Sequence, residues 1–180
     1  MKAGGGKTKG GQFEREIAKT LSLWISIGEN PNIFWRSASS GAKATTGFKK
    51  GIKDDAQAGD ICAVDPSGAT LINNFFIELK FYRNLHMESM IYGKPAKNSI
   101  LEFWNKAQEQ ALQYNKIPVV IAKQNGQSIK LITNYTGWNL MTAWWGNPDN
   151  YIIINKYEAY IFDFEFLINK CDPKMIGWGR

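Results

Sequence analysis

Alternating apolar and polar positions predict a β-strand at residues 75–81, because a period of two is typical of a strand. One face is wholly apolar and consists of Phe75, Ile77, Leu79 and Phe81. The opposite face carries Glu78 and Lys80, which lie roughly 7 Å apart because residues two positions apart share a strand face. We expect a strand this apolar inside a sheet, where an ionised carboxylate needs a cation or several hydrogen-bond donors.

Helical spacing of apolar residues predicts two amphipathic helices, at 12–27 and 99–114. The first helix ends before Gly28. The two apolar stripes consist of Phe13, Ile17, Leu21 and Trp24 and of Ile100, Trp104, Ala107 and Ala111. Residues 37–58 have no periodicity and are rich in Ser, Gly, Ala, Thr and Lys, so we predict a long loop there.

Short apolar runs predict the remaining strands, at 33–36, 60–64, 117–122, 129–133 and 151–155. A polar turn at 65–68 predicts a hairpin between 60–64 and a strand over 70–82. The pair Asn125-Gly126 is a strong hairpin signal and joins the next two strands. With a short helix after Asp163, this order predicts an α/β fold, a mixed sheet flanked by helices.

The same pattern divides the chain into three parts. Residues 1–10 are rich in Gly and Lys and predict a flexible basic arm. Residues 11–133 hold the core, and residues 134–180 form a C-terminal extension packed on the same domain. The tryptophans of the extension either belong to the core or a subunit contact, or stack on unpaired bases; they are Trp138, Trp144 and Trp145.

Composition and charge narrow the class of protein. The chain has 180 residues, of which 44% are hydrophobic, so one domain with a real core is expected and a disordered chain is excluded. The net charge of +6 and a pI near 9.2 favour a polyanionic partner, either nucleic acid or an anionic membrane surface. No apolar run approaches about 20 residues and no secretory signal is visible, so we expect an intracellular, cytoplasmic protein. Cys62 and Cys171 define neither a zinc spacing nor a disulfide framework.

Two carboxylates and a lysine near the predicted hairpin suit a divalent metal. Mg²⁺ prefers oxygen ligands and commonly takes one or two carboxylates. Asp60, Glu78 and the backbone carbonyl of Leu79 can supply these oxygens. Such a metal polarises a phosphate and activates water, while Lys80 can stabilise the developing charge. The alternative is an exposed Glu–Lys pair on a half-solvated strand.

The first predicted helix supplies a third acid. At roughly 100° per residue, Glu14 lies about 65° from the centre of the apolar stripe and Glu16 about 95° from it on the other side. Glu14 therefore borders the buried face and can reach the end of a sheet, whereas Glu16 faces solvent. Alternatively, Glu14 is only a favourable acid in the first turn of a helix.

Four motifs follow one another along the chain: Lys9 to Ile17 (KGGQFEREI), Trp35 to Ser39 (WRSAS), Gly59-Asp60-Ile61 and Ile77-Glu78-Leu79-Lys80. In this combination they resemble the PD-(D/E)XK nuclease superfamily, and most closely its archaeal-type Holliday junction resolvases. The resemblance covers residues 9 to about 123 and implies a restriction-endonuclease-like fold. Gly59 departs from the proline of the superfamily name, the 41–58 loop is longer than in the resolvases, and the segment after Gly126 has no recognised counterpart.

The resemblance implies roles for individual residues. Glu14, Asp60 and Glu78 bind a divalent metal, and Asp60, Glu78 and Lys80 carry catalysis. Residues expected at the DNA, from the resemblance and from the basic charge, are Lys9, Arg15, Arg36, Ser37, Ser39, Lys43, Lys49 and Lys50. Gln108 and Gln110 either support the active site, as a Gln-x-x-x-Tyr pair does in some branches, or are simply good helix formers.

These observations predict a metal-dependent DNA endonuclease that selects branched structures such as a Holliday junction. Mg²⁺ is the expected cofactor, with Mn²⁺ able to substitute. Resolution of a junction needs two cuts, so the analogy implies a homodimer. One alternative is a restriction-like or nicking endonuclease of duplex DNA. Another is a non-catalytic DNA-binding protein that retains the fold.

Overall fold

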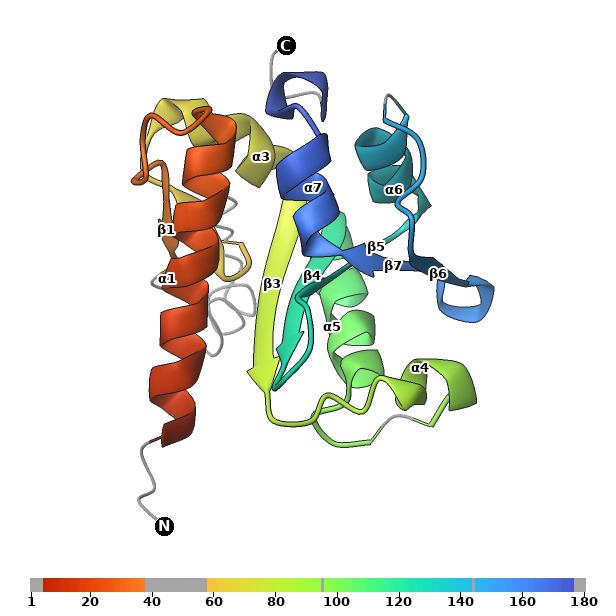
Figure 1. The fold of residues 1–180 in the computed structure, drawn as a ribbon. Coiled ribbons are helices and arrows are strands. Elements are labelled where there is room, and N and C mark those ends of the chain that lie inside the picture. The colour runs from red at the N-terminus through yellow and green to blue at the C-terminus, as the bar shows by residue number, and fades with distance from the viewer. Residues whose placement is uncertain (1–4, 38–57, 95, 144, 177–180) are drawn as a thin grey trace.

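The computed structural model describes residues 5–37, 58–94, 96–143 and 145–176. A five-stranded sheet carries helices on both faces, and a two-stranded sheet lies beside it (Figure 1). The helices are α1 (Gly5–Ile25), α3 (Ala69–Asn74), α4 (Glu88–Tyr92), α5 (Ile100–Gln113), α6 (Tyr135–Thr142) and α7 (Phe164–Lys170). The strands are β1 (Phe34–Arg36), β2 (Ile61–Ala63), β3 (Phe75–Tyr82), β4 (Ile117–Gln124), β5 (Lys130–Thr133), β6 (Tyr151–Ile154) and β7 (Ala159–Asp163). Short 3-10 turns are η2 (Pro66–Gly68), η3 (Asn155–Tyr157) and η4 (Pro173–Ile176).

The central sheet is mixed and has the order β3-β4-β5-β7-β6. β3 and β4 are parallel, and α4 and α5 form the crossover connection that parallel neighbours require. The other neighbouring strands are antiparallel. The predicted α/β fold with a mixed sheet flanked by helices is therefore confirmed, and so is the hairpin at Asn125-Gly126.

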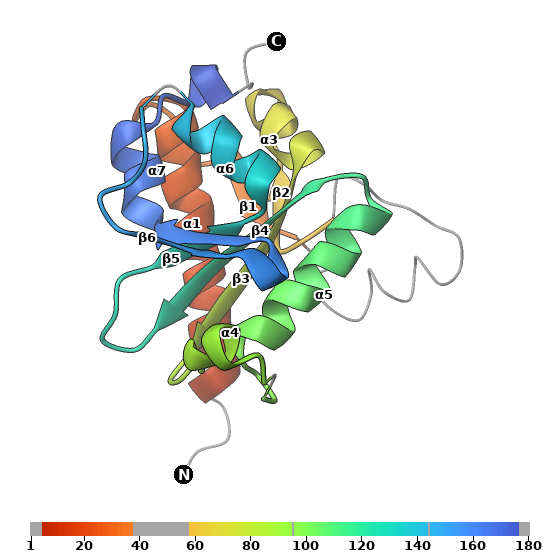
Figure 2. The ribbon, with the colours of Figure 1, turned by 90° about the vertical axis from the view of Figure 1, so that its right-hand side faces the viewer.

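Two hydrophobic cores cover the two faces of this sheet. On one face α1, α6 and α7 pack against alternate strand residues such as Ile77 and Leu131. On the other face α5 packs against the intervening residues, such as Val120 and Ile132. In the side view of Figure 2, α5 lies in front of β3 and β4, and α1 stands behind them. The apolar stripes predicted for the two long helices are buried as expected.

The hairpin predicted between 60–64 and 70–82 is wrong. β2 pairs with β1 instead, in antiparallel register, and forms the small second sheet. Residues 69–74 form α3, so that β3 is the last part of the predicted strand only. The chain therefore reaches β3 through a helical turn rather than a strand-to-strand turn.

Local hydrogen bonding and burial explain this helical turn. The Asp65 carboxylate accepts a hydrogen bond from the Ser67 N–H at 2.9 Å, which caps η2. Leu71 and Ile72 are adjacent and both buried. On a strand they point to opposite faces, whereas one turn of helix allows both to contact the same core. The apolar residues that predicted a strand here are therefore buried as expected, but their backbone is helical.

β3 lies at the edge of the central sheet, and the prediction that it sits inside the sheet is wrong. The segment before β2 covers its free edge. Gly59 forms a parallel bridge with Ile77, and the Asp60 N–H donates to the Ile77 carbonyl at 2.8 Å. This cover, together with helices on both faces, accounts for the apolar character of an edge strand.

The first helix begins earlier than its pattern predicted. α1 starts at Gly5 and not at residue 12, so residues 5–10 are helical where a flexible arm was expected. Glycine is a weak helix former. Because of Gly10 and Gly11, the start of the helix was predicted too late in the sequence. Gly11 lies beside Arg36, because a Cβ atom at Gly11 would lie 3.3 Å from the Arg36 Nη1 atom.

Residues after 133 continue the central sheet. β7 pairs with β5, and β6 pairs with β7; α6 and β7 were not predicted. Trp138 is 7% exposed, and its ring contacts those of Tyr151, Tyr160 and Phe162. Its predicted core role is confirmed, while Trp144 lies outside the described residues.

Neither cysteine takes part in a disulfide, as the sequence spacing predicted. Cys62 lies on β2 and Cys171 follows α7, and both are buried. Among the helices that the structure describes, none combines the length and the apolar character that a membrane crossing requires.

Candidate active site

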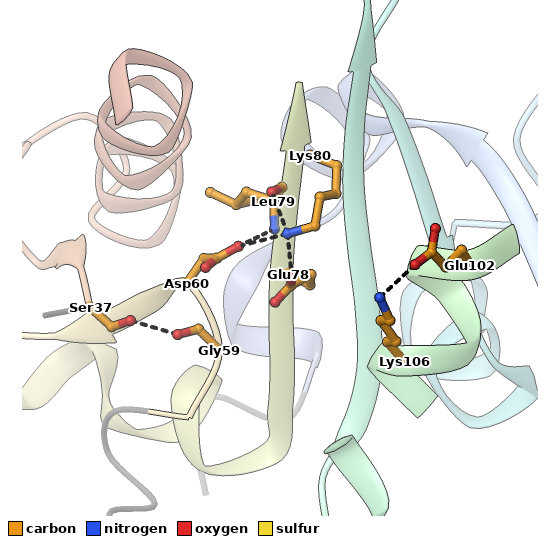
Figure 3. A network of polar contacts seen from close by, with 8 residues as sticks. All are labelled: Ser37, Gly59, Asp60, Glu78, Leu79, Lys80, Glu102 and Lys106. Carbon is orange, nitrogen blue, oxygen red and sulfur yellow. Dashed lines mark hydrogen bonds and ion pairs between the residues drawn. The ribbon is translucent and has the colours of Figure 1, made fainter. Parts of the chain in front are cut away.

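The ammonium group of Lys80 marks the centre of the candidate site, on the edge strand β3 (Figure 3). It forms an ion pair with the Glu78 carboxylate and donates to the Leu79 carbonyl at 3.2 Å. The Asp60 Oδ2 atom lies 3.7 Å from the same nitrogen. The oxygens predicted from the sequence as metal ligands on Asp60, Glu78 and Leu79 thus converge on one cation, which is Lys80 itself.

Asp60 is held rigidly against β3. Its Oδ2 atom accepts a hydrogen bond from the Leu79 N–H at 2.8 Å, and its own N–H donates to the Ile77 carbonyl at 2.8 Å. The residue is only 6% exposed. The predicted hairpin would have placed Asp60 at the site by pairing its strand with β3. In the structure β2 pairs with β1, and these two hydrogen bonds to β3 place Asp60 there instead.

Ser37 and Gly59 fix the backbone that carries Asp60. The Ser37 N–H donates to the Asp60 carbonyl at 2.9 Å, and its hydroxyl donates to the Gly59 carbonyl at 2.6 Å. Gly59 has φ +90°, and a Cβ atom there would lie 2.5 Å from the Ile77 carbonyl oxygen, so this conformation requires glycine. Ser37 was expected at the DNA, but it is 1% exposed and positions Asp60 instead.

Glu14 enters the site from α1 and is paired with Arg36 of β1. The Arg36 Nε atom lies 3.0 Å from Glu14 Oε2, and the two side chains are 40% and 17% exposed. Glu16 is 52% exposed, so the predicted difference between the two acids is confirmed. Arg36 reaches Glu14 across Gly11, where a Cβ atom would lie 3.3 Å from its Nη1 atom.

The carboxylates of the site are more numerous than the cations, and their pKa values reflect it. Burial and the Asp60 charge raise the pKa of Glu78 to about 7, although Lys80 acts against this rise. Burial and Asp60 likewise raise the pKa of Glu14. Burial acts to lower the pKa of Lys80, but the Glu78 and Asp60 carboxylates outweigh it and raise that pKa above its usual value. A divalent cation would relieve this excess of negative charge.

The donor set fits such a cation, although it is not a complete cage. Within the described residues no three His, Cys, Asp or Glu side chains form a group that could hold a metal ion together. Mg²⁺ does not need one, because it usually takes one or two carboxylates and keeps several waters. Asp60, Glu78 and Leu79 already surround one cation. The buried Glu14 Oε2 atom forms an ion pair with Arg36 but accepts no well-aligned hydrogen bond from any described residue, so it retains capacity for a further donor or cation.

The two predicted glutamines occupy different sides of α5. Gln108 donates to the Tyr157 carbonyl at 3.4 Å, on the side of α5 that faces η3. Gln110 shares a helix face with Phe103, seven positions earlier, and the Phe103 ring lies 5.4 Å from Lys80 Nζ. Tyr114 stacks on Phe76 of β3. Of the two glutamines, Gln110 therefore lies on the face of α5 that runs along β3.

The remaining predicted DNA contacts divide into two groups. Lys9 and Arg15 lie exposed on α1, and Arg36 is half-buried beside Glu14. The others fall within 38–57, outside the described residues; they are Ser39, Lys43, Lys49 and Lys50. Gly11 and the positioning role of Ser37 were missed by sequence reasoning. The sequence signal for Gly11 was the pair Gly10-Gly11, which lies one helical turn before Glu14.

A protein-family model matches nearly the whole chain. A family model described as "Phage putative PDDEXK endonuclease" matches residues 5–177, which includes the strands after β5. Comparisons with curated proteins and with solved structures find no match. The family carries the PD-(D/E)XK signature in its name, in agreement with the Asp60, Glu78 and Lys80 cluster. The chain belongs to the phage putative PDDEXK endonuclease family.

Proposed function

We propose that this protein is a metal-dependent endonuclease that hydrolyses phosphodiester bonds in DNA. The observation that carries the proposal is the convergence of Asp60, Glu78 and the Leu79 carbonyl on one cation at the sheet edge. A protein that only binds DNA gains nothing from buried carboxylates next to a polyanion. The raised pKa of Glu78, caused by burial and by Asp60, is the electrostatic penalty of that arrangement.

Each residue of the site has a role in this proposal. Asp60, Glu78 and the Leu79 carbonyl would hold the metal, with Glu14 as a further carboxylate. Mg²⁺ or Mn²⁺ bound there would polarise the phosphate and lower the pKa of a bound water. Lys80 contributes a positive charge to the phosphate oxygens, where a compact ammonium group serves well. Ser37 acts through Asp60 and is a positioning residue.

The chain's basic charge supports DNA as the substrate. With a net charge of +6, lysine and arginine side chains can bind phosphates without reading the sequence. Lys9 and Arg15 are exposed on α1, and Arg36 is 40% exposed while it holds Glu14. We therefore infer selection of DNA structure, a branched junction above all, and not of a base sequence.

A homodimer is part of the proposal, and β6 is the surface that favours it. Tyr151, Ile152 and Ile153 are 43%, 54% and 43% exposed on this outermost strand. Asp149 precedes the strand and Lys156 follows it, both exposed. An antiparallel second copy on β6 brings opposite charges together at both ends and covers the unpaired edge. We propose that two copies join through β6.

The test is cleavage of a plasmid and of a four-way junction in Mg²⁺ or Mn²⁺, with linear duplex of the same length for comparison. We expect Asp60→Ala and Lys80→Ala each to lose at least about 100-fold in rate. Lys106→Ala is the matched control, because Lys106 forms only an exposed ion pair with Glu102 (Figure 3). Unchanged cleavage in both site variants contradicts the proposal.

Two other outcomes identify the alternative functions. Cleavage of linear duplex as rapidly as of the junction indicates a restriction-like or nicking endonuclease. Tight DNA binding that EDTA does not alter, without cleavage in either metal, indicates a binding protein that retains the fold.

A further inference from the structure

A cavity on the outer side of α1 and β1 stands next to the candidate active site. Its volume is about 260 Å³. The lining residues are Arg15, Ala18, Lys19, Pro31, Asn32, Phe34, Trp35 and Arg36. We call it the Trp35 pocket. Arg36 belongs to both places, because it lines the pocket and its Nε atom lies 3.0 Å from Glu14.

The charge of the Trp35 pocket suits an anion. Arg15, Lys19 and Arg36 line it, and no carboxylate is among the described residues that do. The Nη1 atoms of Arg15 and Arg36 lie 3.7 and 3.3 Å from the position that a Cβ atom on Gly11 would take, so both guanidinium groups border Gly11. A phosphate between them would replace repulsion by charge-assisted hydrogen bonds.

The pocket also offers a half-exposed aromatic surface. On β1 the neighbouring Phe34 points into the core and is 1% exposed, whereas Trp35 is 51% exposed. Aromatic side chains beside cations are the combination with which proteins bind single-stranded nucleic acid: bases stack on the rings and phosphates contact the basic groups. In an intact duplex the bases stack on one another, so their faces are not accessible to Trp35.

We propose that the Trp35 pocket binds one unpaired nucleotide of the DNA substrate. The base stacks on Trp35, and its phosphate contacts Arg15, Lys19 and Arg36. The volume of about 260 Å³ lies below that of most pockets for larger ligands, about 300–1,000 Å³, and suits a single base. This inference rests on the proposed nuclease function. It specifies the substrate class as DNA with an unpaired nucleotide next to the cleavage site.

The experiment measures DNA binding in EDTA, so that cleavage plays no part. Fluorescence anisotropy compares a blunt duplex with the same duplex carrying splayed, unpaired ends. Wild type is compared with Trp35→Ala, with Trp35→Phe, which keeps a stacking ring, and with Lys19→Ala. Tyr92→Ala is the matched control, because Tyr92 is an exposed aromatic residue on α4 (74% exposed) outside the pocket.

We expect Trp35→Ala to weaken binding of the splayed DNA at least about fivefold and that of the blunt duplex less than about twofold. Trp35→Phe restores most of the difference, and Tyr92→Ala leaves it unchanged. Lys19→Ala weakens both complexes and reduces the salt dependence by about one phosphate contact. Equal weakening of both DNAs by Trp35→Ala, or none, overturns the inference.

The two proposals fail in different ways. If Asp60→Ala abolishes cleavage but Trp35→Ala does not discriminate between the DNAs, only the nucleotide pocket is wrong. If Trp35→Ala discriminates but cleavage is absent in every metal, the nuclease proposal fails and the pocket remains.

Discussion

A single lysine is paired with two carboxylates in this site, Asp60 and Glu78, and the excess of negative charge makes Glu78 sensitive to pH. Its pKa is raised to about 7 by burial and by Asp60, so the folded protein holds this proton more tightly than the unfolded chain. The resulting stabilisation is fully present below about pH 4.5, the ordinary value, and is lost as the pH rises to about 7. Glu78 therefore destabilises the metal-free protein at neutral pH.

The melting temperature in EDTA should fall between pH 5 and pH 7.5 for this reason. Glu78→Gln removes the titrating group, so we expect a distinctly flatter pH dependence for this variant. Adding Mg²⁺ at pH 7.5 should raise the melting temperature of the wild type more than that of Glu78→Gln, because a ligand of the folded state stabilises it. Parallel pH profiles for the two proteins, measured by differential scanning fluorimetry, would falsify the assignment to Glu78.

Gly11 gives a second prediction for a single residue, and Gly10 gives its control. Alanine favours a helix over glycine by about 1 kcal/mol, so Gly11→Ala and Gly10→Ala should both leave the fold as stable or stabilise it. At Gly11 the new Cβ lies 3.3 Å from Arg36 Nη1, whereas at Gly10 no atom lies within 4 Å. We expect only Gly11→Ala to lose cleavage activity, by about tenfold, through a shifted Arg36–Glu14 pair.

Urea unfolding gives the stabilities and junction cleavage gives the activities of these two variants. Equal activities would mean that Arg36 does not depend on the space above Gly11. A large loss of stability in Gly11→Ala alone would mean that the contact is structural.

At the scale of elements, the spacing of apolar residues predicted a helix correctly wherever one of its faces is buried along several turns. The stripes of α1 and α5 were predicted because one side of each helix contacts the sheet over several turns, and the position of Glu14 followed from that geometry. The β4–β5 hairpin was predicted from its turn residues. These elements depend on local sequence and on one large interface.

The segment between β2 and β3 shows where periodicity is insufficient. The run at residues 69–74 was compatible with a strand, but the cap at Asp65 and the burial of Leu71 and Ile72 on one core favour a helix. For the same reason the predicted proximity of Asp60 to Lys80 agrees with the structure, whereas the strand pairing from which it was predicted is wrong. The contacts that hold it come from Ser37 and the β3 backbone, and long-range contacts of this kind leave no periodic signal.

At the scale of the whole molecule, the exposed edge strand β6 predicts the oligomeric state. The wild type should be a dimer in solution if β6 pairs with a second copy. Ile152→Lys places a charge on the strand, and charged residues on an edge oppose pairing. We expect this variant to be monomeric by light scattering after size exclusion. Leu112→Lys is the control, because Leu112 is 81% exposed on α5 and not on the edge.

A monomeric wild type contradicts the β6 interface, and so does a dimer that Ile152→Lys leaves intact. The variant also separates assembly from chemistry. Each copy holds its own Asp60, Glu78 and Lys80, so a monomer should still nick one strand of the DNA while it loses paired cuts on a junction.

The conformation of Gly59 decides whether this chain tolerates the proline of the superfamily's name. Proline requires φ near −65°, but Gly59 has φ +90°, and a Cβ atom there would lie 2.5 Å from the Ile77 carbonyl oxygen. Proline therefore cannot occupy this position unless the backbone that carries Asp60 moves. The residue that gives the superfamily the first letter of its name is thus incompatible with the backbone of this candidate site.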